Sequence, residues 1–396
     1  MWPANLDPGT MDFQLTEEQQ QLKEAARKYA DERMVAVAEH CEQNNEPPGS
    51  EVRKDLADHG FLGINVGEEY GGMGRPHLDA IIVLEQFARI STASAFPVFE
   101  SCVGPIKAIE HFASEELKQK VLPRVCSGDI QVSVCMSEPN AGTALTDLTT
   151  SAREDGGELV INGQKRWTSG GGHADGYVVY CRMSDEAGAR GIGAVFVEKD
   201  TPGLSFGKHE TLGGWRGVGH CDIYFDNARV PMENQIVPAG GFKKLMQAFD
   251  LERCGNATMS LGLAVGALEQ AAEYVQERKQ FGKPIIDFQA VQIRLAEMAM
   301  EVEAARLLIH RAVYNASVGM PSIFESSTAK CFANQIVRSV CVNGMQVMGG
   351  YGYAAEYGME QRVRDSFGWG LAGGTIDVQK TNIASAMVGR RFNQRG

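Results

Sequence analysis

The stretch INGQKRWTSGGGHAD, residues 161–175, ends a short β-rich run and passes into a turn with three consecutive glycines. Similar runs follow at 177–180, 194–197 and 223–225, separated by Gly, Asp, Asn and Pro. This pattern is typical of a small antiparallel sheet or barrel. Residues 131–236 are therefore predicted to form a β domain.

Apolar residues at helical spacing flank this segment on both sides. Thr16 opens TEEQ, a capping box that satisfies the first free N–H groups of a helix, and helical spacing recurs up to about residue 130. It returns after 237 in three long stretches. We therefore predict an α+β fold of three domains in the order helical, β and helical, at 11–130, 131–236 and 237–396. Residues 1–10 (MWPANLDPGT) are interpreted as a flexible extension.

Composition excludes several classes of protein. The chain has 396 residues, and 50 acidic against 38 basic side chains give a net charge of -12. Nucleic-acid binding is disfavoured, because it needs a clustered positive surface. The absence of a long apolar run or a signal segment predicts no membrane insertion. The expected location is the cytoplasm, or the mitochondrial matrix for a eukaryotic chain.

Neither cysteine nor histidine spacing predicts a metal site. The nine cysteines are scattered, and no two are two residues apart, which fits neither zinc nor a disulfide framework. His173 and His220 have no carboxylate or cysteine at ligand spacing and are interpreted as ordinary loop histidines.

Four segments carry features of a ligand site, and each feature has a simpler alternative. Ser137 and Thr143 flank a Pro-Asn-Ala-Gly turn, where backbone amides could approach a flat or anionic ligand; a plain surface turn fits equally. Trp167 could stack on a planar cofactor or be a core tryptophan. Near the C-terminus, Arg278 and the Gly349–Gly350 turn suit a pyrophosphate, or a helix end with a solvated arginine.

Taken together and in this order, the segments resemble the acyl-CoA dehydrogenase family of FAD flavoenzymes. The resemblance covers almost the whole chain from Met11. It implies a helical N-terminal domain, a middle β-barrel domain and a C-terminal four-helix-bundle domain. It also implies FAD, an acyl-CoA substrate, a homotetramer or homodimer, and electron transfer to an electron-transferring flavoprotein. The motifs that carry it are LTEEQ (15–19), EEYGG (68–72), SEPNAG (137–142), NGQKRWTSGGG (162–172), YFDNARVP (224–231), ERKQFGKPI (277–285) and QVMGGYGY (346–353).

The resemblance also implies residue roles. Met136 and Ser137 correspond to positions at the flavin pyrimidine edge, and Trp167 and Ser169 to the ring-stacking and flavin N5 positions. Thr143 corresponds to a hydroxyl near the CoA pantetheine. The CoA channel corresponds to Phe249, Asp250 and Arg253. Five residues correspond to those that a neighbouring subunit contributes to the FAD site: Arg278, Phe281, Gln289, Gln346 and Gly350. Thr375 corresponds to a position near the adenine half of FAD.

The chain departs from the family at the catalytic base. Most members carry a glutamate immediately before a Gly-Thr near the C-terminus, and this position is Gly373. A minority resembling isovaleryl- and long-chain-type enzymes carry the glutamate before the CoA-channel arginine, which is Glu252 here. We expect Glu252 to remove the pro-R Cα proton while the Cβ hydride passes to flavin N5. Gly373 retains the backbone N–H that polarises the thioester carbonyl. The alternative is that Glu252 belongs to a solvated helix-face pair.

The segment ASAFPVFESCVG (93–104) is expected to be a loop at the floor of the acyl pocket. Members that act on dicarboxylyl or sulfinyl thioesters use an arginine there, which this segment lacks. Phe96 and Phe99 suggest an apolar acyl group, branched or cyclic chains included. Glu100 would repel an anionic tail.

Three other functions remain open. The first is an enoyl-CoA reductase that runs the reverse reaction. The second is a base-free eliminase or desulfinase, a group that shares the ending AGGT (372–375) but replaces the helix glutamate by an amide. The third is a catalytically inactive FAD-binding subunit.

Overall fold

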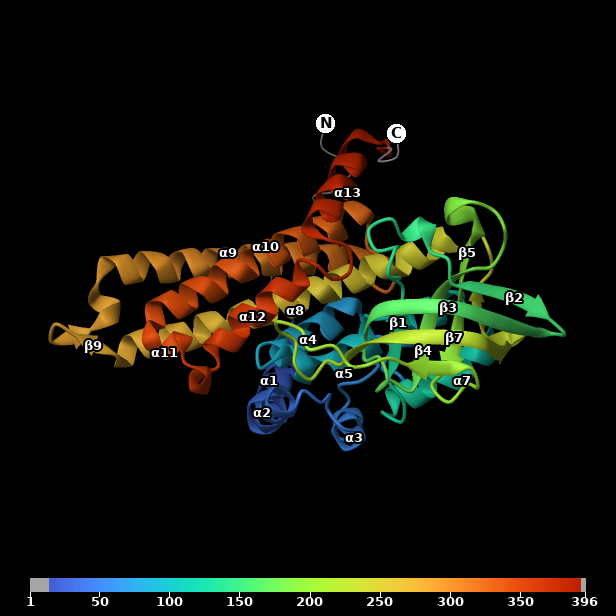
Figure 1. The fold of residues 1–396 in the computed structure, drawn as a ribbon. Helices are drawn as coiled ribbons and strands as arrows, with labels where there is room; N and C mark the ends of the chain where they lie inside the picture. The colour runs from blue at the N-terminus through green and yellow to red at the C-terminus, as the bar shows by residue number, and fades with distance from the viewer. Residues whose placement is uncertain (1–13, 393–396) are drawn as a thin grey trace. The chain divides into compact units, whose positions relative to one another are not determined.

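The computed structural model describes residues 14–392, so the extension predicted at 1–10 lies outside the described residues. Helices come first, then strands, then helices (Figure 1), which confirms the predicted α+β order. The first block comprises α1 (Glu17–Tyr29), α2 (Val35–Asn44), α3 (Ser50–Asp58), α4 (His77–Ala88), α5 (Thr92–Cys102), α6 (Ile106–Phe112) and α7 (Glu115–Cys126), with a π-helical turn at Ala30–Met34 between α1 and α2.

The predicted capping box opens α1. The Thr16 hydroxyl accepts a hydrogen bond from the Gln19 backbone N–H at 3.2 Å, and the Thr16 N–H donates to Gln19 Oε1 at 3.1 Å. This contact is local in sequence, which is why the motif could be recognised without any knowledge of the fold.

The loop predicted at 93–104 is wrong, because residues Thr92–Cys102 form helix α5 with Pro97 inside it. A proline inside a helix costs about 3 kcal/mol through its missing N–H and its ring. In α5 the side chains of Phe96, Val98 and Phe99 are all buried. Burial of these apolar groups, at about 1.5–3 kcal/mol each, outweighs that cost.

The middle of the chain forms an eight-stranded sheet in the order β6-β7-β3-β2-β4-β5-β8, with β1 paired in parallel to β4. Strand β3 pairs antiparallel with β7, and the register shifts between Lys165 and Thr168. The strands contribute a buried apolar cluster that includes Tyr177 of β4, Val195 of β5 and Phe225 of β7. The strands are β1 (Val132–Cys135), β2 (Ser151–Asp155), β3 (Glu158–Ser169), β4 (Gly176–Arg182), β5 (Ile192–Glu198), β6 (Leu204–Phe206), β7 (His220–Pro231) and β8 (Gln235–Val237).

Long helices dominate the C-terminal part, and α9 and α10 run side by side (Figure 1). Helix α10 also packs against α12 and α13, so it is the central element of this region. A short hairpin of β9 (Lys279–Gln280) and β10 (Lys283–Pro284) connects α8 to α9. The helices are α8 (Phe242–Glu277), α9 (Gln289–Ala316), α10 (Ile323–Met348), α11 (Gly350–Tyr353), α12 (Met359–Trp369) and α13 (Ile376–Val388).

The chain divides into two compact units that do not follow its linear order. One contains the chain up to Val35, Ile81–Ala95 and the part from Arg253 onward; the other contains Ala36–Ala80 and Phe96–Glu252. In the first, Arg89 joins two carboxylates from distant segments, Asp31 and Glu269. The predicted boundaries at 130/131 and 236/237 stay predictions. Over residues 14–392, no helix is both long and apolar enough to cross a membrane.

Candidate active site

A buried glutamate fixes the segment that follows β1. Glu138 is 5% exposed, and its Oε1 accepts hydrogen bonds from Lys165 Nζ and the Thr150 N–H, both at 2.9 Å. Its Oε2 accepts from the Thr149 N–H at 2.7 Å. Burial alone would raise the pKa of Glu138, but the charge of Lys165 and these hydrogen bonds outweigh it and lower the pKa to about 2. Glu138 is therefore a permanent anion at neutral pH.

The same ion pair orders the two predicted flavin-edge residues. Lys165 Nζ donates to the Met136 carbonyl at 3.1 Å, and the Arg166 N–H donates to the Ser137 carbonyl at 3.0 Å. Both Met136 and Ser137 are half-buried, so their outer atoms remain accessible. The segment is held on β3 by its backbone, which leaves the Ser137 hydroxyl available to a ligand.

Trp167 is 52% exposed, which contradicts the core-tryptophan alternative. Its backbone has φ +64°, in the register shift where β3 departs from β7. The Arg166 guanidinium lies 4.3 Å from the centroid of the indole ring, and Asp222 and Glu210 bind that guanidinium at 2.7 and 2.8 Å. A bulge of this kind re-aims a side chain out of the sheet. The exposed indole suits contact with a flat ring.

Ser169 lies at the end of β3, opposite His220 at the start of β7. Ser169 Oγ and His220 Nε2 are 3.0 Å apart. The interpretation of His220 as a loop histidine is wrong: it is a strand residue and only 4% exposed. Burial lowers the pKa of His220 to about 4, so its imidazole is neutral at pH 7.

Thr143 lies in an exposed turn after the Pro-Asn-Ala-Gly sequence. A side chain added at the preceding Gly142 would meet nothing within 4 Å, so the backbone here is open to a ligand. The predicted role of Thr143 at pantetheine stays a prediction.

Helix α5 brings the predicted acyl-pocket residues together. The rings of Phe96 and Phe99 are 5.5 Å apart, and Glu100 follows on the same helix at 4% exposed. Ser133 Oγ donates to Glu100 Oε1 at 2.7 Å, and Gln131 Nε2 donates to Oε2. Burial raises the pKa of Glu100 to about 8 despite these hydrogen bonds and the more distant Arg53 charge. The neutral acid dominates at pH 7, which removes the charge expected to repel an anionic tail.

The predicted CoA-channel residues lie on consecutive turns of α8. Phe249, Asp250, Glu252 and Arg253 are exposed by 5, 6, 8 and 6%, respectively. Glu252 is therefore not part of a solvated helix-face pair, and that alternative is wrong. Their roles toward a substrate stay predictions.

The turn at the usual base position has a conformation that favours glycine. Gly373 has φ +60° and Gly374 φ +82°. A Cβ added at Gly373 would lie 3.3 Å from Asn256 Nδ2. The fully buried Lys330 donates to the carbonyls of Ala372 and Gly374, both at 2.8 Å. The turn is thus anchored from α10, and a side chain at 373 would be strained.

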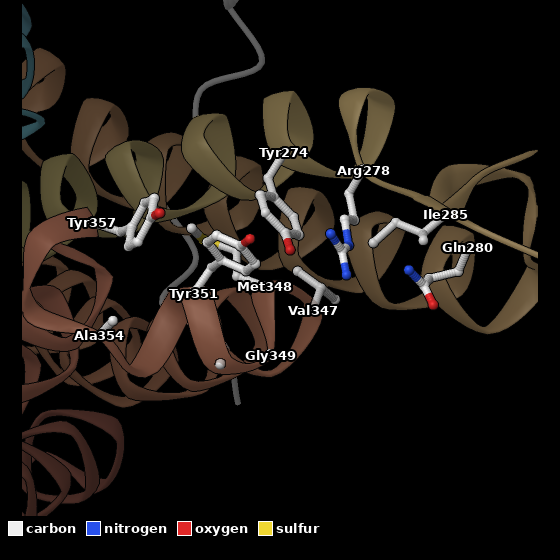
Figure 2. Close-up of a pocket in the computed structure, with 11 residues that line it drawn as sticks. Tyr274, Arg278, Gln280, Ile285, Val347, Met348, Gly349, Tyr351, Ala354 and Tyr357 are labelled. Atoms are coloured by element: carbon white, nitrogen blue, oxygen red, sulfur yellow. The ribbon is translucent and has the colours of Figure 1, made fainter.

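A cavity of about 500 Å³ lies at the end of the C-terminal helical region and includes two predicted cofactor residues, Arg278 and Gly350 (Figure 2). The Arg278 guanidinium lies 5.6 Å from the centroid of the Tyr351 ring. Among residues 14–392 no carboxylate pairs with Arg278, so its charge is available to an anion. Aromatic rings line the cavity from two segments far apart in sequence, at Tyr274, Tyr351 and Tyr357.

The other predicted FAD residues lie outside this cavity. Phe281 is 93% exposed on the β9–β10 hairpin, where its ring contacts Phe288. Gln289 and Gln346 are exposed at the start of α9 and near the end of α10. Thr375 caps α13, its hydroxyl accepting from the Val378 N–H at 3.3 Å.

Within one chain, Thr375 is far from the cavity. The turn that contains it is bound to Lys330, whereas Met348 at the other end of α10 lines the cavity. The separation of these two residues along α10, at about 1.5 Å per residue, is about 27 Å. The structure therefore does not bring Thr375 together with Arg278 and Gly350 in a single subunit.

Sequence reasoning missed several supporting residues. Lys165 and Lys330 are fully buried lysines, and only the fold reveals their partners. One aromatic residue of the cavity had a signal in sequence, since Tyr351 interrupts the glycines of GGYG (349–352). Within the described residues, no group of three or more His, Cys, Asp or Glu side chains could hold a metal ion.

Three family models match the chain in succession. They describe the acyl-CoA dehydrogenase N-terminal domain at residues 16–129, the middle domain at 133–228 and the C-terminal domain at 239–388. The chain belongs to the acyl-CoA dehydrogenase family. It is therefore an FAD-dependent oxidoreductase that acts on an acyl-CoA.

Curated relatives of this family differ in their reactions. The acryloyl-CoA reductase (NADH) of Anaerotignum propionicum is 36% identical over 96% of this chain and 97% of its own length. A 3-sulfinopropanoyl-CoA desulfinase of Paraburkholderia xenovorans is 34% identical over 97% of this chain and 99% of its own. Similarity over the full length therefore does not distinguish the reaction.

Solved structures agree on the fold. Butyryl-CoA dehydrogenase from Megasphaera elsdenii superposes with a TM-score of 0.91 at 30% identity, over 96% of this chain and 100% of that one. A chain from a structural study of the electron transferring flavoprotein of Acidaminococcus fermentans gives 0.92 at 33% identity, over the same shares.

The residues of this chain fit FAD at two places. The exposed Trp167 beside the accessible Ser137 and Ser169 suits a flat, hydrogen-bonding ring system. The Arg278 cation and the tyrosines around it suit an anionic group linked to an aromatic base.

Proposed function

We propose that the enzyme dehydrogenates an apolar acyl-CoA thioester between Cα and Cβ, with Glu252 as the base. The observation that carries this proposal is the burial of the Glu252 carboxylate on α8, in a family member whose usual base position is a glycine. Asn256 follows one turn later on the same helix face, and it is the nearest side chain to a Cβ at Gly373.

The chemistry requires a proton acceptor and a polarised carbonyl. Glu252 takes the Cα proton, and the electron pair of that bond becomes the second bond between Cα and Cβ. FAD, when bound, supplies the two-electron acceptor for the hydride that leaves Cβ. The Gly373 N–H donates to the thioester oxygen, which makes the Cα proton more acidic. Lys330 holds the flanking carbonyls, so this N–H has a fixed direction.

An apolar acyl group is supported by helix α5. The adjacent Phe96 and Phe99 rings offer apolar surface, and Glu100 is mainly neutral at pH 7. These three residues carry no fixed charge at pH 7, so a charged acyl tail would find no ion-pair partner among them.

Assembly as a homotetramer or homodimer is part of the proposal. Helix α9 exposes apolar side chains at seven-residue spacing, a pattern typical of helix–helix contacts. A subunit contact of some kind is what the proposed sharing of FAD residues between subunits, Arg278 among them, requires. The stripe consists of Ile293, Met300, Leu307 and Tyr314, exposed by 52, 71, 39 and 57%.

An electron-transferring flavoprotein is the proposed redox partner, supported by the similar chain in the study of the Acidaminococcus protein. The second candidate function is enoyl-CoA reduction, favoured by the relative named acryloyl-CoA reductase. Desulfination is less well supported despite relatives with that name, because residues 93–104 contain no arginine and position 252 carries a glutamate.

An anaerobic titration tests the proposal. The purified flavoprotein would be titrated with straight, branched and cyclic acyl-CoAs while flavin absorbance near 450 nm, about where oxidised flavins absorb, is recorded. We expect bleaching in the wild type and a loss of at least about a hundredfold in rate in Glu252→Gln, the usual range for a general base. Glu273→Gln, an exposed carboxylate on the same helix, is the matched control and should bleach normally.

The outcomes separate the candidates. Equal bleaching in wild type and Glu252→Gln would remove Glu252 as the base. Absence of bleaching by every saturated thioester, with fast reoxidation of the reduced enzyme by an enoyl-CoA, would favour the reductase.

A further inference from the structure

A buried histidine contacts the hydroxyl that the proposed function places at the flavin. His220 Nε2 lies 3.0 Å from Ser169 Oγ, and the two residues are directly paired across β3 and β7. The Trp215 ring stacks on the imidazole with centroids 5.9 Å apart and an interplanar angle of 30°. Because His220 and Trp215 are only 4% and 6% exposed, the imidazole is held in one place.

The direction of this hydrogen bond decides what Ser169 can do. A serine hydroxyl has one proton and can accept from other donors. If Ser169 donates to His220, its hydroxyl proton is engaged in that hydrogen bond and cannot be donated to a ligand. If His220 donates through Nε2–H, the Ser169 proton is free to point to a ligand. Since the imidazole is neutral at pH 7, it carries a single N–H, and its tautomer selects between these arrangements.

We propose that His220 is a positioning residue that donates its Nε2 hydrogen to Ser169 and so directs the Ser169 hydroxyl proton toward flavin N5. This inference rests on the proposed placement of Ser169 beside the flavin. Ser169 is half-buried, so part of the residue remains accessible while its hydroxyl contacts His220. A hydrogen bond donated to N5 stabilises the oxidised flavin, because reduction places a hydrogen on N5 and removes the acceptor, so this bond lowers the midpoint potential of the flavin.

Two substitutions separate the hydrogen bond from packing. His220→Phe keeps a ring against Trp215 but removes the donor, whereas His220→Gln keeps an amide donor near the Nε2 position but removes the ring. If His220 acts as proposed, His220→Phe resembles Ser169→Ala: the midpoint potential of the bound flavin rises in both variants by a similar amount, set by the loss of one hydrogen bond to the oxidised flavin. His220→Gln stays close to wild type. A packing role predicts the reverse order.

The measurement uses the purified holoenzyme, with flavin content, absorbance spectrum and midpoint potential recorded for each variant. In Ser169→Ala/His220→Phe we expect no shift beyond that of Ser169→Ala, because His220 acts only through the hydroxyl. Additive shifts, or a His220→Gln variant that resembles His220→Phe, would overturn the inference while leaving the proposed reaction intact. If the midpoint potential of Ser169→Ala equals that of the wild type, Ser169 does not contact flavin N5, and the inference about His220 is wrong for that reason. Failure of wild-type flavin to react with any thioester would instead count against the proposed function.

Discussion

Two buried glutamates in the same compact unit, Glu100 and Glu138, are equally inaccessible but differ in charge. They are 4% and 5% exposed, yet the pKa of Glu100 is raised to about 8 and that of Glu138 lowered to about 2. Glu138 has a cation at 2.9 Å and backbone N–H donors, whereas Glu100 has two neutral side-chain donors and a more distant Arg53. Burial raises the pKa of both carboxylates, and only Glu138 has a contacting cation and backbone N–H donors that outweigh it.

The difference matches the segments that the two residues serve. Glu138 ties the predicted flavin segment to β3, where a permanent ion pair gives fixed geometry. Glu100 belongs to the predicted acyl pocket, where a neutral acid avoids a charge next to an apolar chain. Two kinds of experiment test this difference: removal of the cation that pairs with Glu138, and titration of Glu100.

The largest expected effect comes from Lys165→Met. It leaves the Glu138 carboxylate buried without its cation, which typically destabilises a protein by about 3–5 kcal/mol. The apparent melting temperature should fall sharply, and the flavin content of the purified protein should fall with it. Lys54→Met is the matched control, because Lys54 pairs with Asp129 at the surface of the same unit and such pairs contribute about 1 kcal/mol or less.

A second variant checks the cause. Lys165→Met/Glu138→Gln removes the stranded charge and retains one acceptor oxygen for the Thr149 or the Thr150 N–H group, so it should regain part of the lost stability. If the double variant is as unstable as Lys165→Met, packing of the lysine chain rather than charge explains the loss.

The alkaline behaviour of Glu100 gives the next largest effect. Its pKa is higher in the folded state than the ordinary 4.5, so the stability it contributes is present below pH 4.5 and is lost as the pH rises toward 8. Between pH 4.5 and 7 the loss is about 3 kcal/mol, at about 1.36 kcal/mol per pH unit. Glu100→Gln should therefore melt progressively higher than the wild type as the pH rises from 5 to 9. A constant difference between the two proteins would show that Glu100 is not neutral in the fold.

The acid behaviour of Glu138 should run in the opposite direction. Because its pKa is depressed, its contribution is present above pH 4.5 and is lost as the pH falls toward 2. Wild-type protein should thus lose its advantage over Glu138→Gln between pH 4.5 and 2, in melting curves recorded at matched ionic strength. An advantage that persists to pH 2 would contradict the assignment of Glu138 as the anion.

The sequence could predict those features of the fold and the site that depend on neighbouring residues or on a complete motif. The Thr16 capping box, the switch from helical to β periodicity and the segment that contains Trp167 could all be read directly. The exposure of Trp167 could not, because it depends on the register shift between β3 and β7. Likewise, the segment 93–104 is expected from the sequence to be a loop, but Thr92–Cys102 form a helix in which Pro97 is accommodated among buried side chains. The pairing of His220 with Ser169 joins residues 51 positions apart, so no local pattern indicates it.

The smallest expected effect comes from Ser133→Ala, which tests how much one hydrogen bond changes the pKa of Glu100. Ser133→Ala removes the hydroxyl that donates to Glu100 Oε1 at 2.7 Å, a hydrogen bond that holds the pKa of Glu100 below what burial alone would give. The pKa should rise further, and the pH at which wild type and Glu100→Gln diverge most should move upward. The stability change itself should be about 1 kcal/mol. Ser101→Ala is the control, since Ser101 is a buried serine of α5 whose hydroxyl donates to the Val98 carbonyl, and it should leave the titration of Glu100 in place. An identical shift in both variants would mean that general loosening of the helix, rather than the Ser133 hydroxyl, sets the protonation of Glu100.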